Sequence, residues 1–239
     1  GGQGGRRGQE LRAVMLGRRM LRLEREIATF KPRGKEGHTF SRELRDRTKI
    51  LKRLGYLTDE GVITTKGRVA CEVEISEDLV VIECLLKGIF EGATPADVAS
   101  ILSITIAEEK DDAGGKQEAR LAAMVKVVGD SKKDVKDAEK AVGLKTEGEG
   151  GPRAQADELN TSMMDLVHAW CEGADFAEIC ASSKLFEGSI IRTMRRESEL
   201  IHQLTLGAKA AGDSDLETKL EAALKALQRG IPFSSSLYL

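Results

Sequence analysis

Residues 79–90 constrain the fold most, because apolar side chains fill nearly every position of this stretch. A helix over these residues would be apolar around most of its circumference, and such a helix is stable only when other elements surround it. We therefore expect a central helix here, within a helical bundle that spans residues 76–239. Its apolar residues are Leu79, Val80, Val81, Ile82, Cys84, Leu85, Leu86, Ile89 and Phe90.

Helical signals continue along the rest of the bundle. Thr94-Pro95-Ala96-Asp97 predicts a helix start, with Thr94 as the N-cap, Pro95 at the first position and the Asp97 carboxylate facing back. Residues 118–143 predict a long charged helix, and an apolar run then resumes at Leu159 and continues to Trp170. Aromatic residues make up only 4% of the chain, which also favours a mainly α fold.

Residues 41–75 follow a different pattern. A helix is expected from Ser41, as its N-cap, to Gly55, as its C-cap. Two short β-prone runs follow, at residues 56–57 and 62–65, and the turn-forming residues 58–61 separate them. A helix followed by a short β-hairpin predicts the end of a winged helix.

The N-terminal residues are strongly basic. Residues 1–53 hold sixteen Lys and Arg against six acidic residues, whereas the remainder has 21 basic and 33 acidic residues. We interpret residues 1–40 as a basic arm, with a helix at 9–30. This positive charge is explained equally well by two interpretations. The arm could follow the phosphates of a nucleic acid, or it could be a solvated arginine-rich helix.

No motif for nucleotide hydrolysis is present. Gly115-Lys116 is followed by Gln117, and Gly34-Lys35 by Glu36, so neither completes a phosphate-binding loop. The three histidines and four cysteines lack the spacing of a metal site, and we expect the cysteines to be buried thiols. No apolar run is long enough for a membrane span, so no membrane partner is expected.

Residues 187–212 carry the strongest functional pattern. Placed on a helix, Ile190, Met194, Ile201, Leu204 and Ala208 share one side, and Arg192, Arg195, Arg196, Glu199 and Gln203 form a polar stripe opposite. A charged stripe of this kind suits a single strand of nucleic acid, which needs phosphate contacts and side chains beside its bases. A solvated face with ion pairs such as Arg195–Glu199 explains the same pattern.

Several segments resemble the C-terminal (DSHCT) region of the DExH-box RNA helicases that feed the RNA exosome. They are residues 62–73 (VITTKGRVACEV), 165–173 (DLVHAWCEG), 176–180 (FAEIC), 186–196 (FEGSIIRTMRR) and 236–239 (SLYL). The resemblance covers roughly residues 41–239, and FEGSIIR is more similar to the nuclear TRAMP-complex branch than to the cytoplasmic superkiller branch. Glu197-Ser198 replaces a usual Leu-Glu pair, and residues 230–232 (GIP) replace a usual Asp-Ile-Val.

The resemblance implies a non-catalytic module that guides single-stranded RNA during unwinding, for exosome-mediated processing and decay, including rRNA processing. Residues 187–212 match the family's ratchet helix, with Arg196 and Glu199 as its RNA-facing residues and Arg192 one turn earlier; Arg195 joins them on the stripe. The basic helix at 9–30 resembles the stalk of an arch insertion. Implied partners are a RecA core in the same polypeptide, the exosome and TRAMP-type subunits, with a nuclear location or, alternatively, a cytoplasmic one. ATP and Mg²⁺ are expected only in the helicase core, which this sequence lacks.

Two other interpretations remain open at this point. Residues 174–200 read as a helix-turn-helix, with residues 174–182 as its first helix and a recognition helix from Ser189, which would suit a stand-alone winged-helix nucleic-acid-binding or scaffold protein. A purely structural α-bundle would bind no nucleic acid.

Overall fold

The computed structural model describes residues 35–74, 78–111, 115–143 and 159–234. The chain divides into two compact units, residues 1–47 and 48–239. In the first unit the described residues belong to helix α2, where the Arg47 guanidinium pairs with Glu43 one turn earlier, at 2.8 Å. The predicted helix at 9–30 and most of the predicted arm at 1–40 lie outside the described residues.

Helices make up most of the described residues, which confirms a mainly α fold. The helices are α2 (Lys35–Arg53), α3 (Thr65–Ala70), α4 (Asp78–Leu86), α5 (Pro95–Ile106), α6 (Lys116–Arg120), α7 (Ala122–Val142), α8 (Met164–Cys171), α9 (Phe176–Ala181), α10 (Glu187–Ala211), α11 (Ser214–Leu227) and the 3₁₀ turn η2 (Ile231–Phe233).

The predicted β-hairpin does not form two strands. Leu57 and Ile63 make a single antiparallel bridge, and no strand occurs in the described part of the chain. The second run is cut short because the Thr64 hydroxyl accepts a hydrogen bond from the Gly67 N–H at 3.1 Å, so that α3 begins at Thr65. This geometry does not support the winged-helix interpretation. The preceding helix begins at Lys35 rather than at Ser41, and Gly55 follows its end with a positive φ of 77°, as expected of a glycine there.

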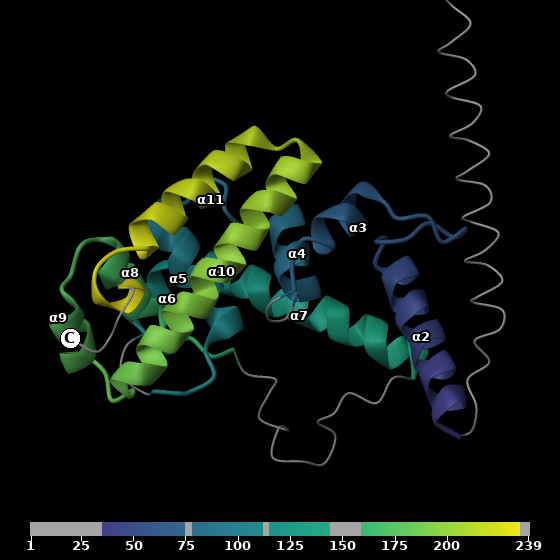
Figure 1. The fold of residues 1–239 in the computed structure, drawn as a ribbon, viewed down its shortest axis with the longest axis horizontal. Helices are drawn as coiled ribbons and strands as arrows, with labels where there is room; N and C mark the ends of the chain where they lie inside the picture. The colour runs from purple at the N-terminus through teal and green to yellow at the C-terminus, as the bar shows by residue number, and fades with distance from the viewer. Residues whose placement is uncertain (1–34, 75–77, 112–114, 144–158, 235–239) are drawn as a thin grey trace, which may run out of the picture. The chain divides into compact units, whose positions relative to one another are not determined.

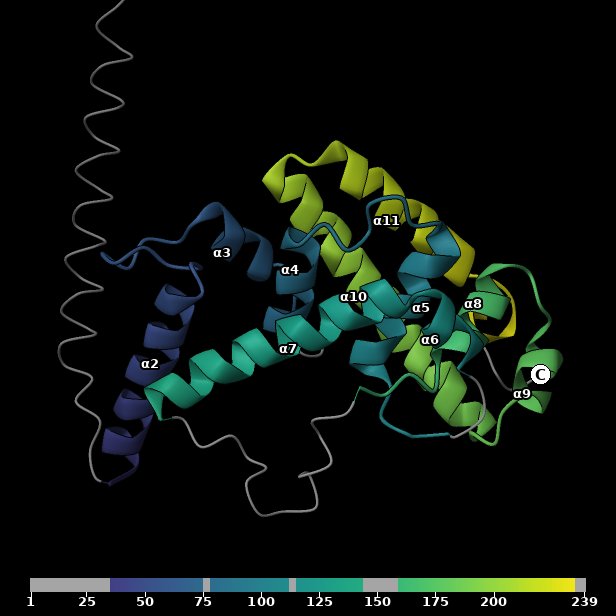
Figure 2. The ribbon, with the colours of Figure 1, turned by 180° about the vertical axis from the view of Figure 1, so that it is seen from behind.

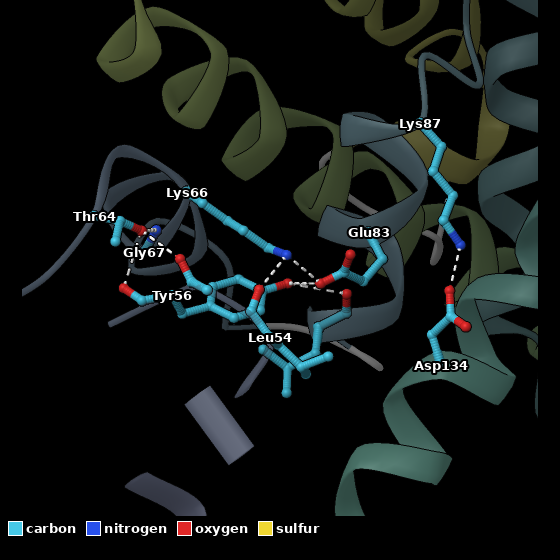
Figure 3. A network of polar contacts seen from close by, with 10 residues as sticks. Leu54, Tyr56, Thr64, Lys66, Gly67, Glu83, Lys87 and Asp134 are labelled. Carbon is cyan, nitrogen blue, oxygen red and sulfur yellow. Dashed lines mark hydrogen bonds and ion pairs between the residues drawn. The ribbon is translucent and has the colours of Figure 1, made fainter. Parts of the chain in front are cut away.

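A polar network joins this turn to α3 and α4 (Figure 3). Lys66 Nζ lies 2.6 Å from Glu83 Oε1, donates to the Leu54 carbonyl at 2.6 Å, and stands 4.4 Å from the centre of the Tyr56 ring. The Tyr56 hydroxyl donates to the same carboxylate at 3.0 Å. Because the Glu83 carboxylate accepts from both Lys66 and Tyr56, the network satisfies polar groups that lie largely out of solvent.

Among the described helices, the most buried is α5 rather than the predicted central helix at 79–90. Ten of the twelve residues of α5 are buried, whereas α4 ends at Leu86 and leaves that side chain 56% exposed. Gly88, with a φ of 67°, turns the chain after α4, and Ile89 and Phe90 enter the core from the turn that follows. The apolar run was thus correctly predicted to be core, but its helix is shorter than expected.

The predicted start of α5 is confirmed in detail. The Thr94 hydroxyl accepts from the Asp97 N–H at 3.2 Å, and the Asp97 carboxylate accepts from the Thr94 N–H at 3.1 Å. The same carboxylate binds the Arg120 guanidinium and lies 3.4 Å from His168 Nε2. Burial opposes the ionisation of Asp97, but the hydrogen bonds from Arg120 and Thr94 outweigh it and lower the pKa of Asp97 below its ordinary value.

Three helices of residues 48–239 pack against α5, namely α8, α10 and α11. Helices α10 and α11 run side by side and both contact α5, which also packs against α8 (Figures 1 and 2). Trp170 links α8 to the end of α11. Its side chain is buried, with 1% exposed, and its indole N–H donates to the Leu227 carbonyl at 2.8 Å. The Arg229 guanidinium stacks 3.7 Å from the centre of its ring. The predicted helix at 118–143 is broken at Leu121 into α6 and α7, and α7 packs against α4.

Candidate nucleic-acid interface

Helix α10 is a long helix with one face fixed in the core. It runs for 25 residues and ends at Ala211, and the φ of 76° at Gly212 suits the residue after a helix. The five side chains predicted to share its apolar side are at most 2% exposed: Ile190, Met194, Ile201, Leu204 and Ala208. The predicted orientation of α10 is therefore confirmed, and its polar stripe faces outward.

The four residues predicted to bind RNA lie in different surroundings along this stripe. Arg192, Arg195 and Glu199 are exposed, and Arg196 is half-buried. Within the described part of the chain, no hydrogen bond or ion pair engages the Arg192 guanidinium. Glu199 accepts a hydrogen bond at 3.2 Å from the amide of Gln203, which lies one turn further along the helix.

Arg195 is bound to the C-terminal segment. Its Nε donates to the Pro232 carbonyl at 2.6 Å, and its Nη2 donates to the Ser234 carbonyl at 3.2 Å. These bonds tie η2 to α10, so the guanidinium already performs a structural task. Sequence reasoning missed this contact because the two partners are 37 residues apart and one of them is a backbone carbonyl.

Arg196 is paired with a carboxylate from another part of the chain. Its Nη1 binds Glu108 Oε1, in the segment that follows α5, with side-chain exposures of 40% and 65%. The next residue, Glu109, accepts a hydrogen bond from the Ser189 hydroxyl at 2.5 Å. A small pocket lies where these residues meet Arg192, and Met163 and Leu185 supply its apolar lining.

Hydrogen bonds from residues 160–162 hold the acidic segment in place. The Asn160 amide donates to the carbonyls of Ala107 and Glu109 at 3.1 and 2.9 Å. The Ser162 hydroxyl accepts from the Asp111 N–H at 2.8 Å. Both ends of residues 107–111 are therefore anchored, which places Glu108 and Glu109 beside α10.

Glu197, next to Arg196, points the other way. It is fully buried, and neither carboxylate oxygen has a hydrogen-bond partner among the described residues. Burial raises the pKa of Glu197 well above its ordinary value of 4.5. The signal was available in the sequence, because position 197 lies three residues after Met194 and four before Ile201, on the buried side of the helix.

The described residues show no grouping of His, Cys, Asp and Glu that could hold a metal ion, and none of their helices is long and apolar enough to cross a membrane. Cys84 is buried, but Cys71 is exposed, so the expectation of four buried thiols was wrong at that position. The first helix of the predicted helix-turn-helix is reduced to the six residues of α9.

These observations define a mainly helical module that presents a polar stripe on one long helix. The sequence pattern of the DSHCT (NUC185) domain matches residues 60–234, and the chain belongs to the DSHCT domain family. The family resemblance predicted from the sequence is thereby confirmed.

Curated relatives include RNA helicases of the DExH-box type. The chain is 35% identical over 198 residues to the ATP-dependent RNA helicase mtr4 of Schizosaccharomyces pombe, covering 82% of this chain and 17% of the relative. It is 36% identical over 200 residues to the DExH-box ATP-dependent RNA helicase DExH9 of Arabidopsis thaliana, covering 84% and 20%. It is 34% identical over 197 residues to the exosome RNA helicase MTR4 of Homo sapiens, covering 82% and 18%. The chain thus spans about a fifth of the length of these relatives.

Proposed function

We propose that this chain is the RNA-guiding module of an ATP-dependent RNA helicase, and that a single strand of RNA passes along the polar stripe of α10. The observation that carries the proposal is the fixed orientation of α10, whose buried side leaves Arg192, Arg196 and Glu199 along its outer side. A helix held this way presents charged and hydrogen-bonding groups at a constant spacing, which suits a strand with regularly spaced phosphates.

The stripe residues receive different roles in this proposal. Arg192 is exposed and without a partner in the described part of the chain, so its guanidinium is available to a phosphate. Arg196 binds a phosphate either after its ion pair with Glu108 has opened or while that pair is kept. Glu199 faces a base or a ribose. Arg195 contributes mainly by holding the C-terminal segment against α10.

The wider setting is suggested by the relatives of this chain. The human relative is an exosome RNA helicase, and the fission-yeast relative is an ATP-dependent RNA helicase. We propose that this module serves the same process: it would act with a RecA-like motor, deliver RNA to the exosome with TRAMP-type subunits, and support RNA decay and rRNA processing in the nucleus. ATP and Mg²⁺ would bind that motor.

The test is the affinity of the full chain for a labelled single-stranded RNA, measured by fluorescence anisotropy over a range of salt concentrations. Arg192→Ala and Arg196→Ala should each weaken binding, and loss of one phosphate contact should reduce the slope of log K against log salt by about 0.7. Arg68→Ala is the matched control. Arg68 is exposed on α3, which meets α10 near Gly207, about 22 Å along the helix from Arg192.

Equal losses in Arg68→Ala and the two α10 variants would indicate diffuse electrostatic binding and contradict the assignment of α10. Tighter binding to a DNA duplex of defined sequence would favour the helix-turn-helix interpretation instead. If the chain binds no RNA at moderate salt, the interpretation as a purely structural α-bundle is favoured.

A further inference from the structure

The charges around the candidate strand site cancel. Arg192 and Arg196 come from α10, and Glu108 and Glu109 come from the anchored segment after α5. Two guanidinium groups and two carboxylates give the lining of this pocket no net charge. A site that gripped RNA mainly through phosphates would be expected to carry a clear positive excess.

Glu108 occupies a position that a phosphate would take. Its carboxylate binds Nη1 of Arg196, and carboxylate and phosphate oxygens are interchangeable partners for a guanidinium. Glu108 comes from a segment 88 residues away that is held at both ends by hydrogen bonds from residues 160–162. The contact is therefore a built feature of the fold and not a chance pairing of neighbours on one helix.

Breaking the ion pair between Arg196 and Glu108 costs little free energy. The side chains of Arg196 and Glu108 are 40% and 65% exposed, and ion pairs with that much solvent contact are weak. An incoming phosphate can consequently displace the carboxylate at a small cost. The cost nevertheless reduces the affinity at each step of a strand that moves past the site.

We propose that Glu108 is a resident counter-ion of Arg196, which RNA phosphate must displace, and that it keeps the hold of α10 on the strand weak enough for movement. This inference rests on the proposed function and adds a residue that determines the strength of the RNA contact. Glu109, which accepts from Ser189, adds negative charge to the same pocket without neutralising an arginine directly.

The test compares single-stranded RNA affinity and its salt dependence for the full chain and the charge-neutral variant Glu108→Gln, which keeps an oxygen to accept from Arg196. Glu108→Gln should bind RNA about two- to fivefold more tightly and steepen the salt slope by about 0.7, equivalent to one added phosphate contact. Most of this gain should vanish when Glu108→Gln is combined with Arg196→Ala. Glu221→Gln, at an exposed position on α11, is the distant charge control.

The outcomes separate the two proposals. If Arg196→Ala weakens binding but Glu108→Gln leaves affinity and slope unchanged, or weakens binding, the counter-ion role is wrong and the proposed function stands. If Glu108→Gln increases RNA affinity equally in the wild-type and Arg196→Ala backgrounds, the gain comes from the overall charge of the chain. That outcome would also overturn the inference. Binding seen only after Glu108→Gln supports it, and failure of every variant to bind RNA removes both proposals.

Discussion

Replacing Glu197 by leucine should stabilise the bundle, because the wild-type carboxyl is fully buried and unpartnered among the described residues. A buried polar group without a hydrogen bond costs about 1–3 kcal/mol, and leucine fills a similar volume with apolar atoms. We therefore expect Glu197→Leu to raise the free energy of unfolding by about 2 kcal/mol at acidic pH. For a unit of this size, that corresponds to a rise in Tm of roughly 4–8 °C.

The pH dependence makes this prediction sharper. Burial raises the pKa of Glu197 in the folded chain above its ordinary 4.5, so the folded state binds more protons than the unfolded state between these two values. Stability from this group is fully present below pH 4.5 and is lost as pH rises towards the folded pKa, with a slope of up to about 1.4 kcal/mol per pH unit. Both Glu197→Leu and Glu197→Gln should remove this slope.

Chemical denaturation from about pH 5 to about pH 6.5 provides the measurement, with the difference between variant and wild type read at each pH. Glu197→Gln keeps a polar group in the same place, so it should flatten the slope without the full apolar gain of leucine. Glu199→Gln, two residues along and exposed, is the control for loss of a carboxylate from the same helix. Parallel pH profiles for wild type and Glu197→Gln would show that the carboxyl is not buried in the way the structure places it, and would refute the reasoning.

Two further variants test other parts of the fold. Gly67→Ala would place a Cβ 2.4 Å from the Tyr56 carbonyl oxygen, so it should destabilise the unit by about 1–3 kcal/mol; a thermal melt with unchanged Tm would contradict this. Arg195→Ala removes the two bonds to the C-terminal segment and should lower stability by about 1 kcal/mol while reducing RNA affinity less than Arg196→Ala does, as melts and anisotropy on the same samples would show. If Arg195→Ala reduced RNA affinity more than Arg196→Ala, the RNA contact would be assigned to Arg195 instead.

The sequence predicted the helical parts of the fold where local chemistry decides the outcome. The start of α5 follows from a threonine, a proline and an aspartate at fixed spacing, and these residues satisfy each other without help from the rest of the chain. The hairpin failed for the opposite reason. Residues 62–65 have β-prone side chains, but the cap that Thr64 makes to α3 competes for the same residues, and the helix start prevails.

The orientation of α10 was predictable because a helix of 25 residues repeats its pattern over many turns. The partners of its stripe were not predictable. Glu108 and Pro232 are 88 and 37 residues away from the arginines that they meet, and no spacing rule connects residues at such distances. A helical wheel shows which side chains face outward, but it does not show which of them are already engaged.

This difference changes how the polar stripe should be understood. By helical position alone, Arg192, Arg195 and Arg196 are three equivalent positive charges. In the structure, one is free of described partners, one holds the C-terminal segment, and one shares its charge with Glu108. The stripe therefore carries one cation without a partner among the described residues and one cation that an incoming anion would have to free from Glu108. Under the proposed function, a contact of this kind would hold RNA and release it again as the strand moves along α10.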